Sequence, residues 1–251
     1  MKVLFIKNRK HLYLFSFIFA LFIILLSMIF IYNSQSFAVN FEKNSFFNID
    51  VSISLNDIEK SADKKAYLTF DDGPTTKATG KILDVLKEND VKAAFFITGH
   101  YLNTKPELVK RMIDEGHIVG NHTVNHPSMP DLDNDKVKEE IMKLHVTVFE
   151  KFGYEMKYLR PPKGEFSQRT LYLSKSLGYT TVMWSFAYDD WDENKQGREN
   201  YAKEKILSNT HNGAVILLHA NSKDNTNILD ETIKEIKKQG YEFKTLDEFK
   251  R

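Results

Sequence analysis

Two adjacent carboxylates end the first apolar run that follows the amino-terminal region. Residues 66–70 form that run, and Asp71, Asp72 and then Gly-Pro come directly after it. The run is typical of a buried strand, which Gly-Pro would break. Successive side chains at a strand end point to different sides, so the two carboxylates cannot easily do the same job. Their charges also repel, and a nearby cation would relieve this. The alternative is a simple turn, because Asp-Gly is common turn chemistry.

A pair of histidines is the second group with possible chemistry. His122 and His126 come directly after Gly120-Asn121, at the end of another predicted strand, where they would open a helix or a loop. On a helical turn, imidazoles four residues apart would lie on one face, close enough to bind one metal ion. Such a pair also arises by chance in a chain with eight histidines. Together with Asp72, the pair makes a set of ligands that suits zinc and also iron or manganese.

Three later strand ends carry further candidates. Arg160 precedes two prolines, which fix the backbone and suit the arginine to pairing with a carboxylate, although an ordinary ion pair is the alternative. His219 follows the apolar run 214–218 and is a candidate acid or base, whereas a lone histidine at this place is often structural. Trp184 and Trp191 follow another strand and either cover the core or stack on a sugar.

These residues need a scaffold, and strands and helices alternate from residue 65 onward. The pattern predicts strands at 66–70, 93–97, 117–120, 157–160, 180–184, 214–219 and 241–245. It predicts helices at 76–89, 105–115, 134–152, 168–177, 199–208 and 225–239. Such alternation favours a parallel sheet, and polar residues after strands are typical of barrel and open-sheet enzymes. We therefore predict an α/β fold, a distorted and incomplete (β/α) barrel.

The amino-terminal region differs from the rest of the chain. Residues 12–32 contain no charge, and this length can cross a bilayer as a helix. Residues 1–11 are basic, and no acidic residue appears before Glu42. The positive-inside rule then leaves residues 1–11 in the cytoplasm and exports the remainder. We predict an extracytoplasmic enzyme anchored to the membrane by this helix.

The exported part divides into a connecting segment and a catalytic part. Residues 33–64 are polar and rich in Asn and Ser, which indicates a stalk with a short packing segment. The catalytic domain is predicted at 65–251. Small residues up to Ala38 fit a signal-peptidase site, so cleavage after Ala38, giving a secreted protein, is the alternative to the anchor.

Composition excludes several classes of function. The chain has 35 Lys and Arg against 34 Asp and Glu, and four of the basic residues precede the apolar segment. The exported part is therefore slightly acidic, which argues against a nucleic-acid partner. The chain has no cysteine, so disulfides, thiolate zinc sites and cysteine nucleophiles are excluded.

Taken in order, five stretches resemble the motifs of the polysaccharide deacetylase family, the carbohydrate esterases with a NodB-type domain. They are TFDDGP at 69–74, HTVNH at 122–126, RPPKG at 160–164, a partial AYDDW at 187–191 and LLH at 217–219. The resemblance covers residues 65–249 and implies the incomplete barrel of the NodB-homology type. It also implies a peptidoglycan or other polysaccharide glycan strand as the partner.

The resemblance implies a role for each matching residue. Asp72, His122 and His126 would bind one divalent metal ion, usually Zn²⁺, with Mn²⁺ or Co²⁺ as alternatives. Asp71 would be the general base, held by Arg160, and His219 the general acid. The substrate contacts would come from Pro161, Lys163, Gly164, Trp191 and Leu217, with the backbone N–H of Lys163 at the oxyanion and Leu217 at the acetyl methyl. The ion would polarise the acetyl carbonyl and lower the pKa of a water.

Two positions depart from the family pattern. The family has an aspartate beside its acid histidine, and Ala187 occupies that place here. We therefore expect the pKa of His219 to be near or below its ordinary value, unless Asp189 or Asp190 replaces the missing carboxylate. The family also has an aromatic residue where Lys163 stands.

The run RPPKGEFS, which includes Lys163, resembles the subfamily that deacetylates N-acetylmuramic acid in spore cortex. Members act after an amidase has removed the stem peptide, and muramic δ-lactam follows. The alternatives are deacetylation of N-acetylglucosamine in a wall polymer and a non-catalytic wall-binding protein of the same fold. An iron oxygenase is disfavoured, because its ligands usually have another spacing.

Overall fold

The computed structural model describes residues 64–73 and 78–249. The predicted cytoplasmic segment, membrane helix and stalk at 1–11, 12–32 and 33–64 lie outside the described residues, apart from residue 64. Among the residues that are described, no helix has both the length and the apolar character that crossing a membrane requires.

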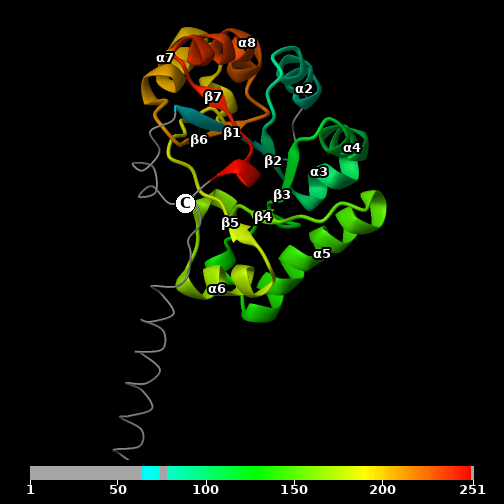
Figure 1. The fold of residues 1–251 in the computed structure, drawn as a ribbon. Coiled ribbons are helices and arrows are strands. Elements are labelled where there is room, and N and C mark those ends of the chain that lie inside the picture. The colour runs from blue at the N-terminus through cyan, green and yellow to red at the C-terminus, as the bar shows by residue number, and fades with distance from the viewer. Residues whose placement is uncertain (1–63, 74–77, 250–251) are drawn as a thin grey trace, which may run out of the picture. The chain divides into compact units, whose positions relative to one another are not determined.

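A single sheet of seven parallel strands lies at the centre of the described part (Figure 1). Its strands are β1 (Lys65–Asp72), β2 (Ala94–Ile97), β3 (Ile118–Asn121), β4 (Tyr158–Leu159), β5 (Thr180–Thr181), β6 (Ala214–His219) and β7 (Glu242–Phe243). The strand order is β5-β4-β3-β2-β1-β6, and β7 pairs with the first residues of β1. Because β1 pairs with β2 and β6 along most of its length, its carboxyl end lies between two neighbours.

The helices come between the strands along the chain, and they lie around the sheet (Figure 1). They are α2 (Thr79–Glu88), α3 (Gly99–Thr104), α4 (Pro106–Asp114), α5 (Asn134–Phe152), α6 (Gln168–Ser176), α7 (Glu199–Asn209) and α8 (Lys223–Lys238). The helix α3 was not predicted, because six residues are too few to show a helical period. It begins where the Thr98 side chain accepts a hydrogen bond from the backbone of Tyr101.

The sheet curls, and among the described residues a single isolated bridge links the segment after β5 to β6. After β5 the chain returns to β6, where Phe186 forms an isolated parallel bridge with Ile216. The Phe186 carbonyl also accepts a hydrogen bond of 2.9 Å from the backbone N–H of Leu217. A bridge replaces a full strand at this place, so the predicted incomplete barrel is confirmed as a curled, parallel half-barrel.

The strand predicted at 180–184 ends at Thr181 for an identifiable reason. The carbonyls of Val182 and Met183 accept hydrogen bonds from the Arg160 guanidinium, at 3.3 and 3.2 Å. A side chain therefore supplies donors that a neighbouring strand would otherwise supply. The predicted strands at 157–160 and 241–245 are likewise reduced to two residues each.

Alternation along β1 separates its two faces. Leu68 and Phe70 belong to the larger core, which includes residues of the surrounding helices, whereas Tyr67 belongs to a smaller core on the other face. By the same alternation, Asp71 shares a face with Tyr67, and Asp72 shares one with Phe70. The expectation that the two carboxylates point to different sides is confirmed.

Candidate active site

Asp71 is held by a buried arginine from another strand end. Arg160 is fully buried, and its Nη1 donates to Asp71 Oδ1 at 2.8 Å while its Nη2 donates to Thr69 Oγ1 at 2.9 Å. Burial acts to raise the pKa of Asp71, but the charges of Arg160 and of nearby imidazoles outweigh burial and lower that pKa below its ordinary value. Asp71 is therefore an ionised carboxylate at neutral pH and can accept a proton.

The arginine rests on an aromatic ring that a glycine accommodates. The Arg160 guanidinium lies 4.2 Å from the centre of the Phe96 ring. A Cβ atom on Gly120 would lie 2.5 Å from that ring, so only glycine fits at this position of β3. The contacts from Gly120 through Phe96 to Arg160 thus set the position of the Asp71 carboxylate.

His122 and His126 come together, although they do not lie on a helix. Their Nε2 atoms are 3.2 Å apart, and the loop between them has left-handed backbone at Thr123 (φ 66°) and His126 (φ 58°). The helical turn considered from the spacing is therefore wrong for this segment. Asn121 shapes the loop, because its Oδ1 accepts from the backbone N–H of Thr123 at 2.9 Å. The position of Asn121 at the end of a strand, directly before His122, could have indicated this role in the sequence.

Both imidazoles are neutral, and the Nε2 atom of His122 presents a lone pair toward His126. His122 Nδ1 lies 2.7 Å from the Arg160 carbonyl, which can only accept, so Nδ1 carries the proton and Nε2 does not. Burial lowers the pKa of His122, and burial together with His122 lowers the pKa of His126 to about 4. A proton shared between the two rings is thus disfavoured at neutral pH.

This donor set fits a divalent metal ion. Two neutral imidazoles whose Nε2 atoms face each other can both turn a lone pair toward one cation, and imidazole nitrogen is a good ligand for zinc and its neighbours. Within residues 64–73 and 78–249, however, no three imidazole or carboxylate groups are gathered into a complete metal site. Asp72 is fully buried, and Thr79 donates a hydrogen bond to its Oδ1 at 3.0 Å. Its role as third ligand stays a prediction.

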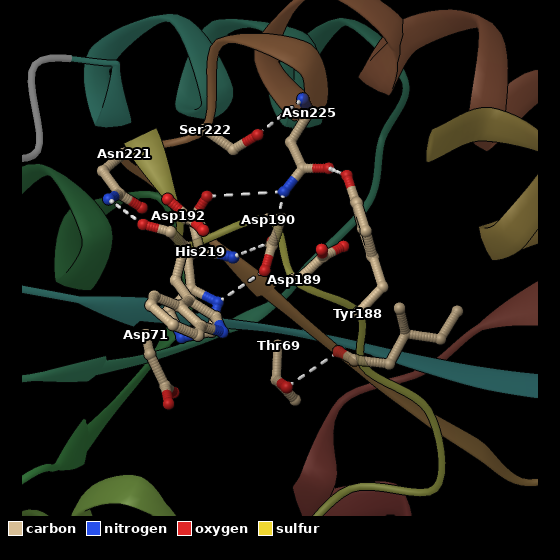
Figure 2. A network of polar contacts seen from close by, with 12 residues as sticks. Thr69, Asp71, Tyr188, Asp189, Asp190, Asp192, His219, Asn221, Ser222 and Asn225 are labelled. Atoms are coloured by element: carbon tan, nitrogen blue, oxygen red, sulfur yellow. Dashed lines mark hydrogen bonds and ion pairs between the residues drawn. The ribbon is translucent and has the colours of Figure 1, made fainter. Parts of the chain in front are cut away.

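His219 at the end of β6 is paired with a carboxylate (Figure 2). Asp190 is 1% exposed, and its Oδ1 lies 2.8 Å from His219 Nδ1, while its Oδ2 accepts from the backbone N–H of His219 at 2.7 Å. Burial acts to lower the pKa of His219, but the hydrogen bond and charge of Asp190 outweigh burial and raise it above the ordinary value. With Nδ1 bound to Asp190, the Nε2–H of a protonated His219 is available as a donor.

The expected loss of this partner at Ala187 is therefore wrong. The segment after Ala187 turns at Asp190 and Trp191, and this turn brings the Asp190 carboxylate to the His219 ring. Asp190 replaces the missing carboxylate, as the sequence analysis allowed for Asp189 or Asp190.

The candidate residues surround one cavity of about 600 Å³. Asp71, His122, His126 and His219 line it, together with four of the predicted substrate contacts, Lys163, Gly164, Trp191 and Leu217. Pro161 is buried and is not among the lining residues. Tyr188 also lines the cavity. The sequence did not predict that Tyr188 lines the cavity, because the motif at 187–191 matches the family only in part.

The wall formed by residues 162–164 has an unusual backbone. Lys163 has φ 58° and Gly164 has φ 71°, both in the left-handed region. A Cβ atom on Gly164 would lie 2.6 Å from the Trp184 ring, so glycine allows Trp184 to close this side of the cavity. The role of the Lys163 backbone N–H at an oxyanion stays a prediction.

Comparisons with known proteins agree with this geometry. Residues 59–182 match the family described as polysaccharide deacetylase. A 30.6 kDa protein from Geobacillus stearothermophilus is 50% identical over 208 residues, which cover 82% of this chain and 77% of that protein. The peptidoglycan-N-acetylmuramic acid deacetylase PdaA from Bacillus subtilis is 44% identical over 187 residues, covering 74% of this chain and 71% of PdaA.

A solved structure gives the same result. The structure of Bacillus subtilis PdaA, described as a family 4 carbohydrate esterase, superposes with a TM-score of 0.71 at 45% identity. The match covers 74% of this chain and 80% of that one.

Proposed function

This chain belongs to the polysaccharide deacetylase family and is a hydrolase of amide bonds, and on that premise we propose that it removes the acetyl group from N-acetylmuramic acid in peptidoglycan. The similarity to PdaA, whose name gives this substrate, supports the choice. In this proposal the product leads to the muramic δ-lactam of spore cortex.

The observation that carries the proposal is a base and an acid on one cavity, each with its own partner. Arg160 favours the ionised form of Asp71, and Asp190 favours the protonated form of His219. In amide hydrolysis a base takes the proton of the attacking water, and an acid protonates the departing nitrogen. Asp71 takes the first role and the Nε2–H of His219 the second. Neither step needs a covalent bond to the protein.

A divalent ion would be held by His122, His126 and Asp72. When bound, it polarises the acetyl carbonyl and acidifies a water. The chain itself orients this site, because the Arg160 carbonyl fixes the His122 ring and the Asn121 side chain fixes the loop that follows. Zn²⁺ is the ion that we propose, because two imidazoles and one carboxylate are a common zinc set.

Lys163 supports muramic acid over glucosamine. Its exposed side chain comes from the wall of the cavity. Muramic acid carries a lactyl carboxylate that glucosamine lacks, and an ammonium group can pair with this carboxylate. A stem peptide converts the carboxylate into a neutral amide. The proposed substrate is therefore glycan from which an amidase-type reaction has already removed the stem.

Mass spectrometry of glycan fragments tests the proposal. The metal-loaded protein is incubated with stem-free and with stem-bearing glycan strands, and the acetyl content of each sugar is measured. We expect loss of acetyl from muramic acid in the stem-free strands. Loss from glucosamine alone would establish the other deacetylase function, and no loss from either sugar would favour a non-catalytic wall-binding protein.

We also propose that the enzyme acts outside the cytoplasm, held at the membrane by residues 12–32. The support is the uncharged run with basic residues before it, and a wall substrate lies on that side. Protease added to intact cells should remove the catalytic domain. Protection of the domain until the cells are lysed would contradict the proposed location.

A further inference from the structure

Asn225 is a buried polar residue with no part in the reaction as described so far. It lies in the first turn of α8, is 1% exposed, and donates from Nδ2 to Asp190 Oδ2 at 2.6 Å (Figure 2). The other oxygen of the same carboxylate is bound to His219 Nδ1. Asn225 thus donates directly to Asp190, the carboxylate that binds the proposed acid His219.

The orientation of the Asn225 amide is determined by its neighbours. A carboxylate can only accept, so the NH₂ group must face Asp190 and the amide oxygen must face the other way. That oxygen accepts a hydrogen bond from the hydroxyl of Tyr188, which lines the cavity. The backbone N–H of Asn225 donates to the Ser222 side chain at 3.2 Å, which fixes the turn itself. Asn225 therefore joins the cavity wall to the Asp190 carboxylate.

The segment that carries Asp190 has a separate attachment to α8. Gln196 donates to the Asp190 carbonyl at 2.9 Å and accepts from the backbone N–H of Lys223 at 2.9 Å. Asp224 accepts from the backbone N–H of Gly197 at 2.7 Å. Because these contacts hold the backbone, removal of the Asn225 amide should loosen the Asp190 carboxyl group without detaching the segment.

We propose that Asn225 is a positioning residue for the reaction, which holds the Asp190 carboxylate in the orientation that keeps one oxygen on His219 Nδ1. Without the amide, only the backbone N–H of His219 still holds Oδ2, so the carboxylate is less firmly oriented and its hydrogen bond to the protonated ring of His219 weakens. The charged groups that bear on His219 are Asp190, Asp71 and Arg160, and the last two remain in place. The inference rests on the proposed role of His219 as the acid.

The test replaces Asn225 by leucine, which keeps the branched shape of the side chain and removes its three hydrogen bonds, to Asp190, to the His219 carbonyl and from Tyr188. The matched control is Asn227→Leu, the same change at an exposed position of the same helix, where the side chain bonds only Glu199 in the described structure. The measurements are kcat and KM against pH, with the metal-loaded protein, and titration of the His219 ring by NMR.

In Asn225→Leu we expect kcat to fall about tenfold, the size of a lost hydrogen bond to a charged group, with KM little changed. The alkaline limb of the rate profile and the titration of His219 should both move to lower pH, while Asn227→Leu leaves both in place. A folded Asn225→Leu protein with an unmoved limb and unmoved titration overturns the proposal.

Asn225→Ala gives the same test if leucine disturbs folding. A His219 titration that moves while the rate profile stays unchanged also overturns a role in the reaction. That result would at the same time show that His219 is not the acid, which separates failure of the proposed function from failure of the Asn225 contact.

Discussion

Asp71 and His219 occupy paired positions on the neighbouring parallel strands β1 and β6. The proposed base and acid are therefore held at one level of the sheet by backbone pairing, and their side chains line the same cavity. Each has a buried partner of opposite charge from another strand end or loop, Arg160 for the base and Asp190 for the acid. The positive charge of Arg160 favours the ionised form of the proposed base, and the negative charge of Asp190 favours the protonated form of the proposed acid.

Removal of the base should leave the metal in place. In Asp71→Asn the shape is kept and the proton acceptor is lost, so we expect turnover to fall by about 10²-fold or more with unchanged metal content. The measurements are kcat and metal analysis of the purified variant. Asp84→Asn changes an exposed aspartate paired with Arg111 and should have no effect. Equal loss of metal in Asp71→Asn would mean that Asp71 is itself a ligand.

Removal of a ligand should affect metal and turnover together. His126→Ala deletes one of the two facing imidazoles, and we expect both the bound ion and the activity to be lost. Metal content is measured by elemental analysis and turnover by acetate release. His211→Ala, at a histidine whose Nδ1 contacts the carbonyl of Asn212, is the control. A His126→Ala protein with a stoichiometric ion and full turnover would rule out this site assignment.

The alkaline limit of activity should depend on Asp190. As the proposed acid, His219 would act while protonated, and its raised pKa would carry that form to higher pH, so we expect activity to be lost as the pH rises through the pKa of the folded protein. In Asp190→Asn the raising charge is gone, and the alkaline limb should move to lower pH. Asp192→Asn, in the same loop, should leave the limb in place. If the alkaline limb of the pH–rate profile does not move in Asp190→Asn, another group sets the pH at which activity is lost.

Restoring the family's aspartate should now change little. The sequence alone predicts that a carboxylate at position 187 would raise the pKa of His219 and move the alkaline limb upward. Because Asp190 already binds the His219 ring, we expect the limb of Ala187→Asp to stay close to that of the wild type. The pH–rate profile of the folded, metal-loaded variant measures this. A clear upward movement of the limb would show that a second carboxylate can raise the pKa of His219 further than Asp190 does alone.

Gly164→Ala should cost more stability than an equally strained glycine elsewhere. Gly153 has φ 65° and open space around it, so Gly153→Ala should cost about 1 kcal/mol of unfolding free energy through the backbone alone. At Gly164 the new methyl group also meets Trp184, so we expect about 2–3 kcal/mol and a raised KM. Urea unfolding and steady-state kinetics measure these. Equal costs at the two positions would show that Trp184 moves aside freely.

Lys163 should affect the choice of sugar. In Lys163→Gln we expect KM for stem-free muramic substrate to rise up to about fivefold, the size of an exposed ion pair, with no loss toward glucosamine substrates. Lys163→Arg keeps the charge and should stay near the wild type. A Lys163→Gln protein with the same preference for muramic acid would exclude recognition of the lactyl carboxylate by this side chain.

The sequence predicted the parts of the site that lie at strand ends. Asp71, Arg160 and His219 each lie at the end of a predicted strand, so the parallel topology alone brings them to one edge of the sheet. The partner of His219 could not be predicted from the motif, because the turn after Ala187 decides which carboxylate reaches the ring. Asn225 was beyond prediction too, since it meets Asp190 across 35 positions of the chain.

The loop that carries the two histidines shows a second limit. Spacing of four residues suggested a helical turn, but Thr123 and His126 have left-handed backbone. The hydrogen bond from Thr123 to Asn121 stabilises that backbone, and no periodic pattern reports such a contact. Strand ends were predictable because burial selects their residues, whereas loop conformation depended on single polar contacts.

The pairing of β1 with β6 has a consequence for biosynthesis. Thr69 on β1 donates to the carbonyl of Ile216 on β6, a contact between residues 147 positions apart (Figure 2). A chain still emerging from the ribosome or the translocation channel has Asp71 and both histidines long before it has His219. Docking of β6 must wait for nearly all of the intervening chain, since non-local strand pairing is slow and comes late. The proposed base and acid therefore come together only once the polypeptide is almost complete, and a chain that ends before residue 219 lacks the proposed acid.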